Sequence, residues 1–472
     1  MLKKEKLMKI ACQEGNVSLL SKLIRENISV NSIDEQKNTP LIIACENGHT
    51  DIVKILLENG AVQDRANAYG VTALMCACRK GHFEIAKMLL EKGVMINKRD
   101  KDGATALIFA CCNGDLEIVK MLIDKGAMID NRDKDGITAL TIMCSWGYLK
   151  IVKMLIDRGA NIDNRDKDGT TALMYACSGG NLEVVKMLIN KGAIIENKNK
   201  DSATALMYAC SNGHLEVLKM LIEKGANIDN SDKAGTTALM YACSRGDLEV
   251  AKMLVDKGAM IDKYDKDGMT ALMYACSGED LEIVKMLTEN GADLELRCSA
   301  NLKAIDIAYM YRNVDIMIKL IETGASVSRC IVDFAISSEE IDLLRSLTRR
   351  KEVLNYIVGE LVQKDKKQLL REVQKELRIL RQNIDSSRVV SSSESLLCNA
   401  VSNKNLDIAN ILMANNSGKT VDKINKLSEL INALEVDEKL KESVVPVHKK
   451  IKLSKIEKEN GLIIDLINSG KN

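Results

Sequence analysis

Apolar and polar residues follow a pattern that returns every 33 residues through most of the chain. In the copy at 100–132, the run 106–113 places its apolar residues on one face of a short helix, at spacings of three and four. The run 116–125 does the same after one break. Each copy therefore predicts a pair of short amphipathic helices.

Polar residues and glycines in the same copy predict where these helices begin and end. The sequence "DKDG" at 100–103 is typical of a turn. Thr105 has the chemistry of a helix N-cap, and Gly114 that of a helix stop. Asp115 is expected to cap the second helix, because its carboxylate can accept bonds from the first backbone N–H groups.

Two short helices cannot bury both of their apolar faces without neighbours, so we expect the copies to stack. Stacked copies form an elongated α-solenoid, in which each unit contacts only the units beside it. Nine of the 14 cysteines follow the same period, at 12, 45, 78, 111, 144, 177, 210, 243 and 276.

The repeated unit resembles the ankyrin repeat. The closest match is "NTPLIIACENGHTDIVKILLENGA" at 38–61, and the resemblance extends from residue 1 to about 330. It implies an all-α ankyrin-repeat solenoid of helix–turn–helix units with β-hairpin-like turn fingers. Later copies carry Ala in place of the family's Pro. They also carry a methionine in place of its His, at Met174, Met207, Met240 and Met273, so we expect these turns to be held mainly by packing.

The pattern divides the chain into five segments. Residues 1–33 form a capping repeat, 34–297 hold eight regular repeats, and 298–350 hold degenerate repeats. Residues 351–395 predict an amphipathic helix followed by a Ser-rich loop, and 396–472 an irregular helical, repeat-like extension.

Composition narrows the class of protein. A net charge of +1 gives no global attraction to nucleic acid or to anionic membranes. We find neither a signal peptide nor a run of about 18 uncharged apolar residues that could span a bilayer. The expectation is a cytoplasmic, monomeric protein, with export by a route lacking a cleavable signal left open.

The cysteine ladder favours a structural role. Equivalent residues of stacked helices lie about 10 Å apart, beyond the reach of a disulfide or of a shared tetrahedral metal ion. We therefore expect small buried thiols, with no metal and no cofactor. The sequence also lacks the common catalytic motifs, so we expect no catalytic residue and no enzyme activity.

Three sets of residues are candidates for contact with a partner. The first is the one Trp of the chain with a neighbouring tyrosine, Trp146 and Tyr148, which break the repeat pattern within "SWGYLK". The second is a ladder of tyrosines, Tyr175, Tyr208, Tyr241 and Tyr274, whose rings are expected to pack between repeats with their hydroxyls in solvent. The third is a line of arginines at the turn tips, Arg99, Arg132 and Arg165, for which mutual pairing with nearby acids is the alternative.

These observations favour a non-catalytic scaffold or adaptor that presents its concave surface to an unidentified protein partner, with no nucleic acid bound and no membrane insertion. One alternative is an effector or enzyme in which the repeats only direct a diverged catalytic C-terminal domain to its target. Another is a redox- or membrane-linked regulator that uses the thiols, or the segment 345–381 with its eleven basic and five acidic residues.

Overall fold

The computed structural model describes residues 2–350 continuously, and beyond them 353–354, 356–357, 360–361, 366, 368–369 and 371–373. The described part is helical, with elements labelled α1 to α22, as the repeat pattern predicts. The chain divides into two compact units, Met1–Tyr274 and Ala275–Asn472. The predictions for 374–395 and 396–472 lie outside the described residues, as do parts of 351–373.

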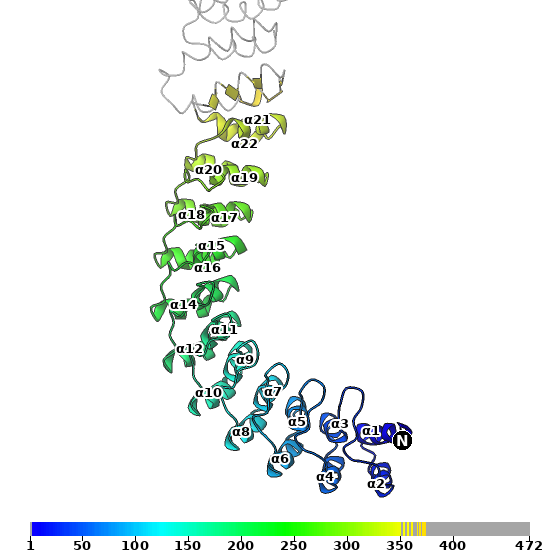
Figure 1. Ribbon diagram of the computed structural model, residues 1–472. Helices are drawn as coiled ribbons and strands as arrows, with labels where there is room; N and C mark the ends of the chain where they lie inside the picture. Colours follow the sequence, from blue (N-terminus) through cyan, green and yellow to red (C-terminus); the bar gives the residue numbers. More distant parts are fainter. Residues whose placement is uncertain are drawn as a thin grey trace, which may run out of the picture. The chain divides into compact units, whose positions relative to one another are not determined.

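The first unit consists of helix pairs that stack side by side (Figure 1). The odd-numbered helices form one row, each packed on the next. They are α1 (Leu2–Glu14), α3 (Pro40–Asn47), α5 (Ala73–Lys80), α7 (Ala106–Asn113), α9 (Ala139–Trp146), α11 (Ala172–Ser178), α13 (Ala205–Ser211) and α15 (Ala238–Arg245). A further odd-numbered helix, α17 (Ala271–Ser277), contains the boundary between the units.

The even-numbered helices form a second row, each packed on the odd-numbered helix before it and on the next even-numbered one. They are α2 (Val17–Arg25), α4 (Thr50–Glu58), α6 (Phe83–Glu91), α8 (Leu116–Asp124), α10 (Leu149–Asp157), α12 (Leu182–Asn190), α14 (Leu215–Glu223) and α16 (Leu248–Asp256). The core lies between the rows. Leu122, Val119 and Cys111 are fully buried there in one copy, and their equivalents are buried in the others.

A five-residue turn, here called a finger, precedes each odd-numbered helix from α3 to α17. The fingers of the first unit are 34–38, 67–71, 100–104, 133–137, 166–170, 199–203, 232–236 and 265–269. In one of them the backbone N–H of Asp100 donates to the carbonyl of Ala104 at 3.0 Å. The carboxylate of Asp100 accepts the N–H groups of Asp102 and Ala104 in return. Isolated antiparallel bridges flank three fingers, such as Arg165 with Thr171, so the hairpin-like turns are present.

Neighbouring fingers are joined through their backbones. The N–H of a finger's second residue donates to the carbonyl of the third residue in the preceding finger, as Lys134 does to Asp102 at 2.6 Å. The donors are Ala68, Lys101, Lys134, Lys167, Lys200, Lys233 and Lys266. This bond recurs at every finger-to-finger junction of the first unit, so the fingers form one connected edge.

The second unit has the same construction in the part that is described. Its helices are α18 (Leu281–Glu289), α19 (Ala304–Met310), α20 (Val314–Thr323), α21 (Arg329–Ser337) and α22 (Ile341–Thr348). Helix α20 packs on α18, α19 and α22, and α21 packs on α22. Only 324–328 separate α20 from α21, which leaves no room for a finger of the usual form.

Two local predictions are wrong. Thr105 stands at the N-cap position of α7, but its hydroxyl is buried and makes no cap bond. Three of the four turns in which methionine replaces histidine are held by more than packing, whereas the turn of Met207 has no cap bond, as the expectation of packing requires. In α11 the Thr171 hydroxyl accepts the N–H of Met174 at 3.4 Å, and the Met174 sulfur accepts the N–H of Thr171 at 3.5 Å. Thioether sulfur is a weak acceptor, so this reciprocal cap is a weakened form of the usual one.

Candidate partner-binding surface

Trp146 and Tyr148 form an exposed aromatic pair at the turn between α9 and α10. Trp146 is the last residue of α9, Gly147 ends that helix with a φ of 77°, and Tyr148 is the N-cap residue of α10. Their ring centroids lie 6.2 Å apart with the planes at 63°, an edge-to-face contact. Trp146 is 51% exposed and Tyr148 is 42% exposed. Two large aromatic side chains are thus available on the surface, as the break in the repeat pattern predicts.

Tyr148 occupies a place that a capping residue fills in the preceding copy. The equivalent Asp115 accepts the N–H groups of Glu117 and Ile118 at the start of α8. The Tyr148 side chain makes no cap bond with α10. Its ring lies over Gly114 of the preceding copy, where an added Cβ would stand 2.9 Å from the Tyr148 hydroxyl. Helix α10 therefore has no side-chain cap at its N-terminus and carries the ring of Tyr148 at the capping position.

A change of charge accompanies the aromatic pair. Lys150 lies in the first turn of α10, where the equivalent residues of neighbouring copies are Glu117 and Glu183. Glu183 pairs with Lys186 at 2.7 Å. The equivalent residues in this copy are Lys150 and Lys153, two cations that cannot pair with each other. Lys150 is exposed, and the described part of the chain supplies it with no ion-pair partner. The aromatic pair is thus accompanied by Lys150, a cation without an ion-pair partner among the described residues, and by Lys153, which interacts with Asp157 of the same helix.

The tyrosine ladder holds the fingers, which corrects the expectation that its hydroxyls reach solvent. Three members donate their hydroxyl to the first aspartate of their own finger: Tyr175 to Asp166, Tyr241 to Asp232 and Tyr274 to Asp265, at 2.7 to 2.8 Å. In the fourth, the Asn199 amide donates to the Tyr208 hydroxyl at 3.1 Å. All four rings are half-buried. Burial, followed by the bond to Asp232, raises the pKa of Tyr241 to about 12.

The arginines of the turn tips bind backbone, and not the neighbouring acids proposed as their alternative partners. Arg132 donates to the carbonyl of Arg165 at 3.3 Å and to the Asn164 side chain at 2.5 Å. Arg165 makes the same two bonds one copy later, to the Lys198 carbonyl and the Asn197 side chain. Arg99 donates to the carbonyl of Arg132. The lysines do pair with acids, as Lys134 with Asp102 at 3.4 Å. The arginines therefore join the segments that lie directly before successive fingers.

The cysteine ladder is buried, as predicted. Its nine members are all buried, and burial raises the pKa of Cys12 from 9.0 to about 12. A thiol in this environment is a weak nucleophile near neutral pH. Among the described cysteines, Cys112 and Cys330 are the exposed ones. Within the described residues, no group of His, Cys, Asp and Glu side chains is arranged to hold a metal ion.

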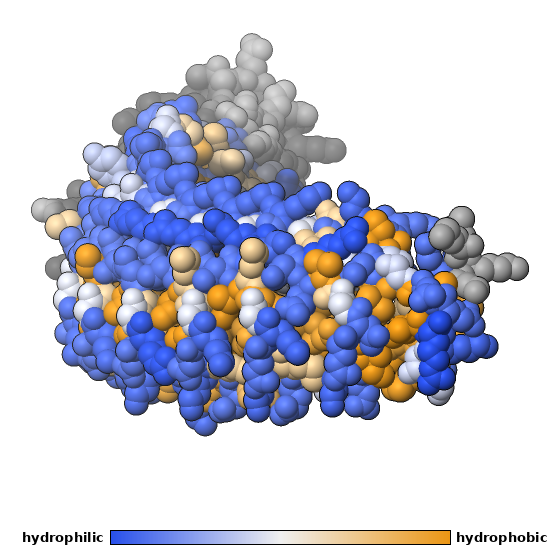
Figure 2. Space-filling model, turned by 60° about the horizontal axis from the view of Figure 1, so that its bottom comes forward, coloured by the Kyte–Doolittle hydropathy of each residue, from blue (hydrophilic) through white to orange (hydrophobic). Residues whose placement is uncertain are grey.

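Apolar side chains are also visible elsewhere on the surface. Figure 2 shows one face on which apolar residues form a band between two hydrophilic bands. Single exposed methionines contribute to the apolar surface, among them Met95 and Met128 at the start of the loops after α6 and α8. None of the helices in the described residues combines the length and the apolar character that a membrane span requires.

The chain was compared with known proteins and families. No curated protein matches it. The family model "Ankyrin repeats (3 copies)" matches at 7–100, 92–166, 159–232, 227–298 and 261–330. These overlapping matches cover more than half of the chain, in the region where helix pairs and fingers alternate with the 33-residue period. The chain therefore belongs to the ankyrin repeat family.

Proposed function

We propose that the protein is a non-catalytic scaffold or adaptor, and that its partner protein contacts the turn between α9 and α10. Ankyrin repeats suggest a protein-interaction module. The observation that carries the proposal is the exposed Trp146–Tyr148 pair, in a copy whose neighbours are polar at the same turn. Tryptophan and tyrosine dominate the residues whose truncation most weakens interfaces, because they bury a large area with few rotatable bonds.

The chemistry around the pair indicates the kind of partner. Lys150 and Lys153 add positive charge next to the two rings, and Lys150 stands where neighbouring copies have a Glu. Complementary charge favours encounter with an acidic surface. We therefore infer a partner segment that combines an apolar residue, seated against Trp146, with acidic residues facing α10.

The tyrosine and arginine ladders have a supporting role in this proposal. The tyrosines are bound to fingers and the arginines join the segments directly before them, so both ladders act by fixing the finger positions. A preformed surface loses less conformational entropy on binding. The half-exposed rings of Tyr175 and its equivalents can contribute contact area of their own.

The test is affinity capture from a lysate of the native cell with three forms of the full chain. The wild type is compared with a repaired copy, Trp146→Asn with Tyr148→Asp and Lys150→Glu, which restores the residues of the preceding copy. The matched control is Arg245→Ala at the last residue of α15, the place that Trp146 holds in α9. The proposal predicts partners retained by the wild type and the control and lost by the repaired copy. Equal capture by all three would refute it.

The competing hypothesis of a catalytic C-terminal domain depends on residues that lie for the most part outside the described ones. Its discriminating measurement is an activity assay on the full chain against a variant ending at residue 350. Hydrolysis or group transfer that the truncated chain lacks would favour that hypothesis over a pure scaffold.

A further inference from the structure

The first finger, 34–38, differs from the seven later fingers of the first unit in the backbone hydrogen bond made by its second residue. In each later finger the second residue's N–H donates to the finger before it, at 2.6 to 2.9 Å. The equivalent group is the backbone N–H of Glu35, and the described residues offer it no acceptor. Glu35 is exposed, so its N–H is open to an acceptor from another molecule. An acceptor at this edge would complete the series of junctions.

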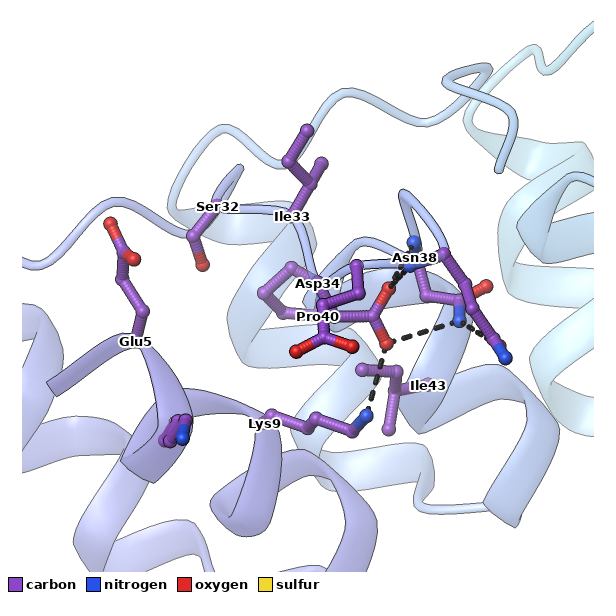
Figure 3. A pocket seen from close by; sticks show the side chains of 11 residues that line it. Glu5, Lys9, Ser32, Ile33, Asp34, Asn38, Pro40 and Ile43 are labelled. Atoms are coloured by element: carbon purple, nitrogen blue, oxygen red, sulfur yellow. Dashed lines mark hydrogen bonds and ion pairs between the residues drawn. The ribbon is translucent and has the colours of Figure 1, made fainter. Parts of the chain in front are cut away.

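A pocket lies at this same edge. It has a volume of about 330 Å³ and opens between α1 and the first finger (Figure 3). Ile33, Pro40 and Ile43 give it apolar walls, and Glu35 and Gln36 line it from the finger. Later copies place the preceding finger against the finger edge, and the backbone bond joins the two. Residues 2–5 stand 33 positions before 35–38 but are helical and form no finger, and among the described residues the edge of 34–38 is open.

The charges at the pocket differ from those at the other junctions. Lysine is the second residue of six fingers, and Lys134 and Lys167 pair with the aspartates at the third position of the preceding finger, at 3.4 and 3.6 Å. The first finger has Glu35 in the lysine's place. Lys9 of α1 is already paired with Asp34 at 3.0 Å, as Figure 3 shows. The second position of the finger therefore has the opposite charge at the open edge, while Glu5 and Lys6 of α1 line the pocket with one charge of each sign.

We propose that this edge binds a turn of a partner protein that is built like a finger and carries Lys or Arg as its third residue. The turn would offer its third carbonyl to the Glu35 N–H, and its basic side chain would face the Glu35 carboxylate. These are the two contacts that join Lys134 to Asp102, with the charges exchanged. The site is separate from the turn of Trp146, so the two proposals can fail independently.

A second copy of this chain does not fit the edge. The third residues of the fingers in the first unit include no Lys or Arg: they are Gln36, Tyr69, Asp102, Asp135, Asp168, Asp201, Ala234 and Asp267. Most would place an aspartate against Glu35, and like charges at such a distance repel. None of these fingers supplies the basic residue that would pair with Glu35, which favours a turn from a different protein.

The probe for the test is a pair of cyclic peptides carrying residues 97–105. One has the native acidic tip and the other has Asp102→Lys, and each is titrated into the full chain by fluorescence anisotropy. The wild type should bind the basic peptide about fivefold more tightly than the acidic one, since an exposed ion pair contributes up to about 1 kcal/mol. Added salt should reduce this preference.

Two variants of one residue separate the backbone contact from the charge. Glu35→Ala keeps the N–H and should bind both peptides equally. Glu35→Pro removes the N–H at a turn position that proline tolerates, and should bind neither. Glu35→Lys should reverse the preference, while Glu58→Lys, the same charge change at the end of α4, should leave it intact.

The proposal is overturned if the wild type binds the two peptides equally, or if Glu35→Pro binds as Glu35→Ala does while its circular dichroism is native. If Glu35→Pro does not fold, the decision rests on Glu35→Lys, and an unchanged preference there overturns it too. Self-association of the wild-type chain that Glu35→Lys strengthens would assign the edge to a second copy and would also overturn it.

Discussion

The finger at 166–170 and the turn between α9 and α10 lie in successive copies, yet their side chains have opposite roles. Asp166 is bound to its own finger and to Tyr175, and equivalent bonds recur in other copies. Trp146 and Tyr148 contact each other, are about half exposed, and have no equivalents in neighbouring copies. Residues that recur every 33 positions hold the array together, and residues that break the period are available to a partner.

The largest effect is expected from removing the aspartate of a finger. Asp166→Ala removes acceptors for two backbone N–H groups and one hydroxyl, and should lower the free energy of unfolding by about 3 kcal/mol. Asp166→Asn should cost less than about 1 kcal/mol, since Asn199 makes the equivalent backbone and tyrosine bonds in the next copy. Urea denaturation measures both. A similar loss in the two variants would contradict the assigned role of this carboxylate.

Removing the tryptophan should affect binding and leave stability almost unchanged. Trp146→Ala is expected to weaken binding of a captured partner about 30-fold, the effect of losing about 2 kcal/mol at an interface anchor. Its free energy of unfolding should change by less than about 0.5 kcal/mol, because half of the side chain is already in solvent. Titration of the partner and urea denaturation give the two numbers. A large loss of stability with intact binding would make Trp146 a structural residue and remove the contrast with Asp166.

Restoring a side-chain cap at the N-terminus of α10 should stabilise the copy that contains Tyr148. Tyr148→Asp should raise the free energy of unfolding by about 1 kcal/mol, because an N-cap carboxylate satisfies N–H groups that the tyrosine leaves without a side-chain cap. The reverse change, Asp115→Tyr at the start of α8, should lower it by a similar amount. Thermal denaturation checks the pair. If Tyr148→Asp destabilises the protein, the ring packed over Gly114 contributes more to folding than a cap would.

The smallest effect is a dependence of stability on alkaline pH. The pKa of Tyr241 is raised from 10.0 to about 12 in the folded chain, so the folded state holds this proton more tightly than the unfolded one. Its contribution is complete below pH 10 and is lost as the pH rises toward 12. The stability of the wild type should therefore fall more steeply over this range than that of Tyr241→Phe. Parallel curves for the two proteins would show that the hydroxyl of Tyr241 is not held by Asp232.

The sequence predicted those parts of the molecule that depend on short spacings. Helix pairs, the stops at Gly114 and its equivalents, and the cap at Asp115 follow from residues three or four positions apart. The bonds of Arg132 and Tyr175 did not follow, because each joins groups nine or about 33 positions apart. One signal was present: an Asp or Asn stands nine residues before every tyrosine of the ladder. The exposure of Trp146 could be expected only from its departure from the repeat.

The bond between fingers has a consequence for the evolution of the protein. Each internal finger of the first unit gives one N–H to the finger before it and receives one from the finger after it, through backbone atoms that every residue except proline supplies. A junction of this kind can form between any two copies, because it uses backbone atoms alone. Duplication or loss of a whole 33-residue unit would leave each remaining junction satisfied, so the length of the array can change by recombination without redesign of its interior. The near-identity of adjacent copies such as 170–193 and 203–226 is what repeated duplication would leave behind.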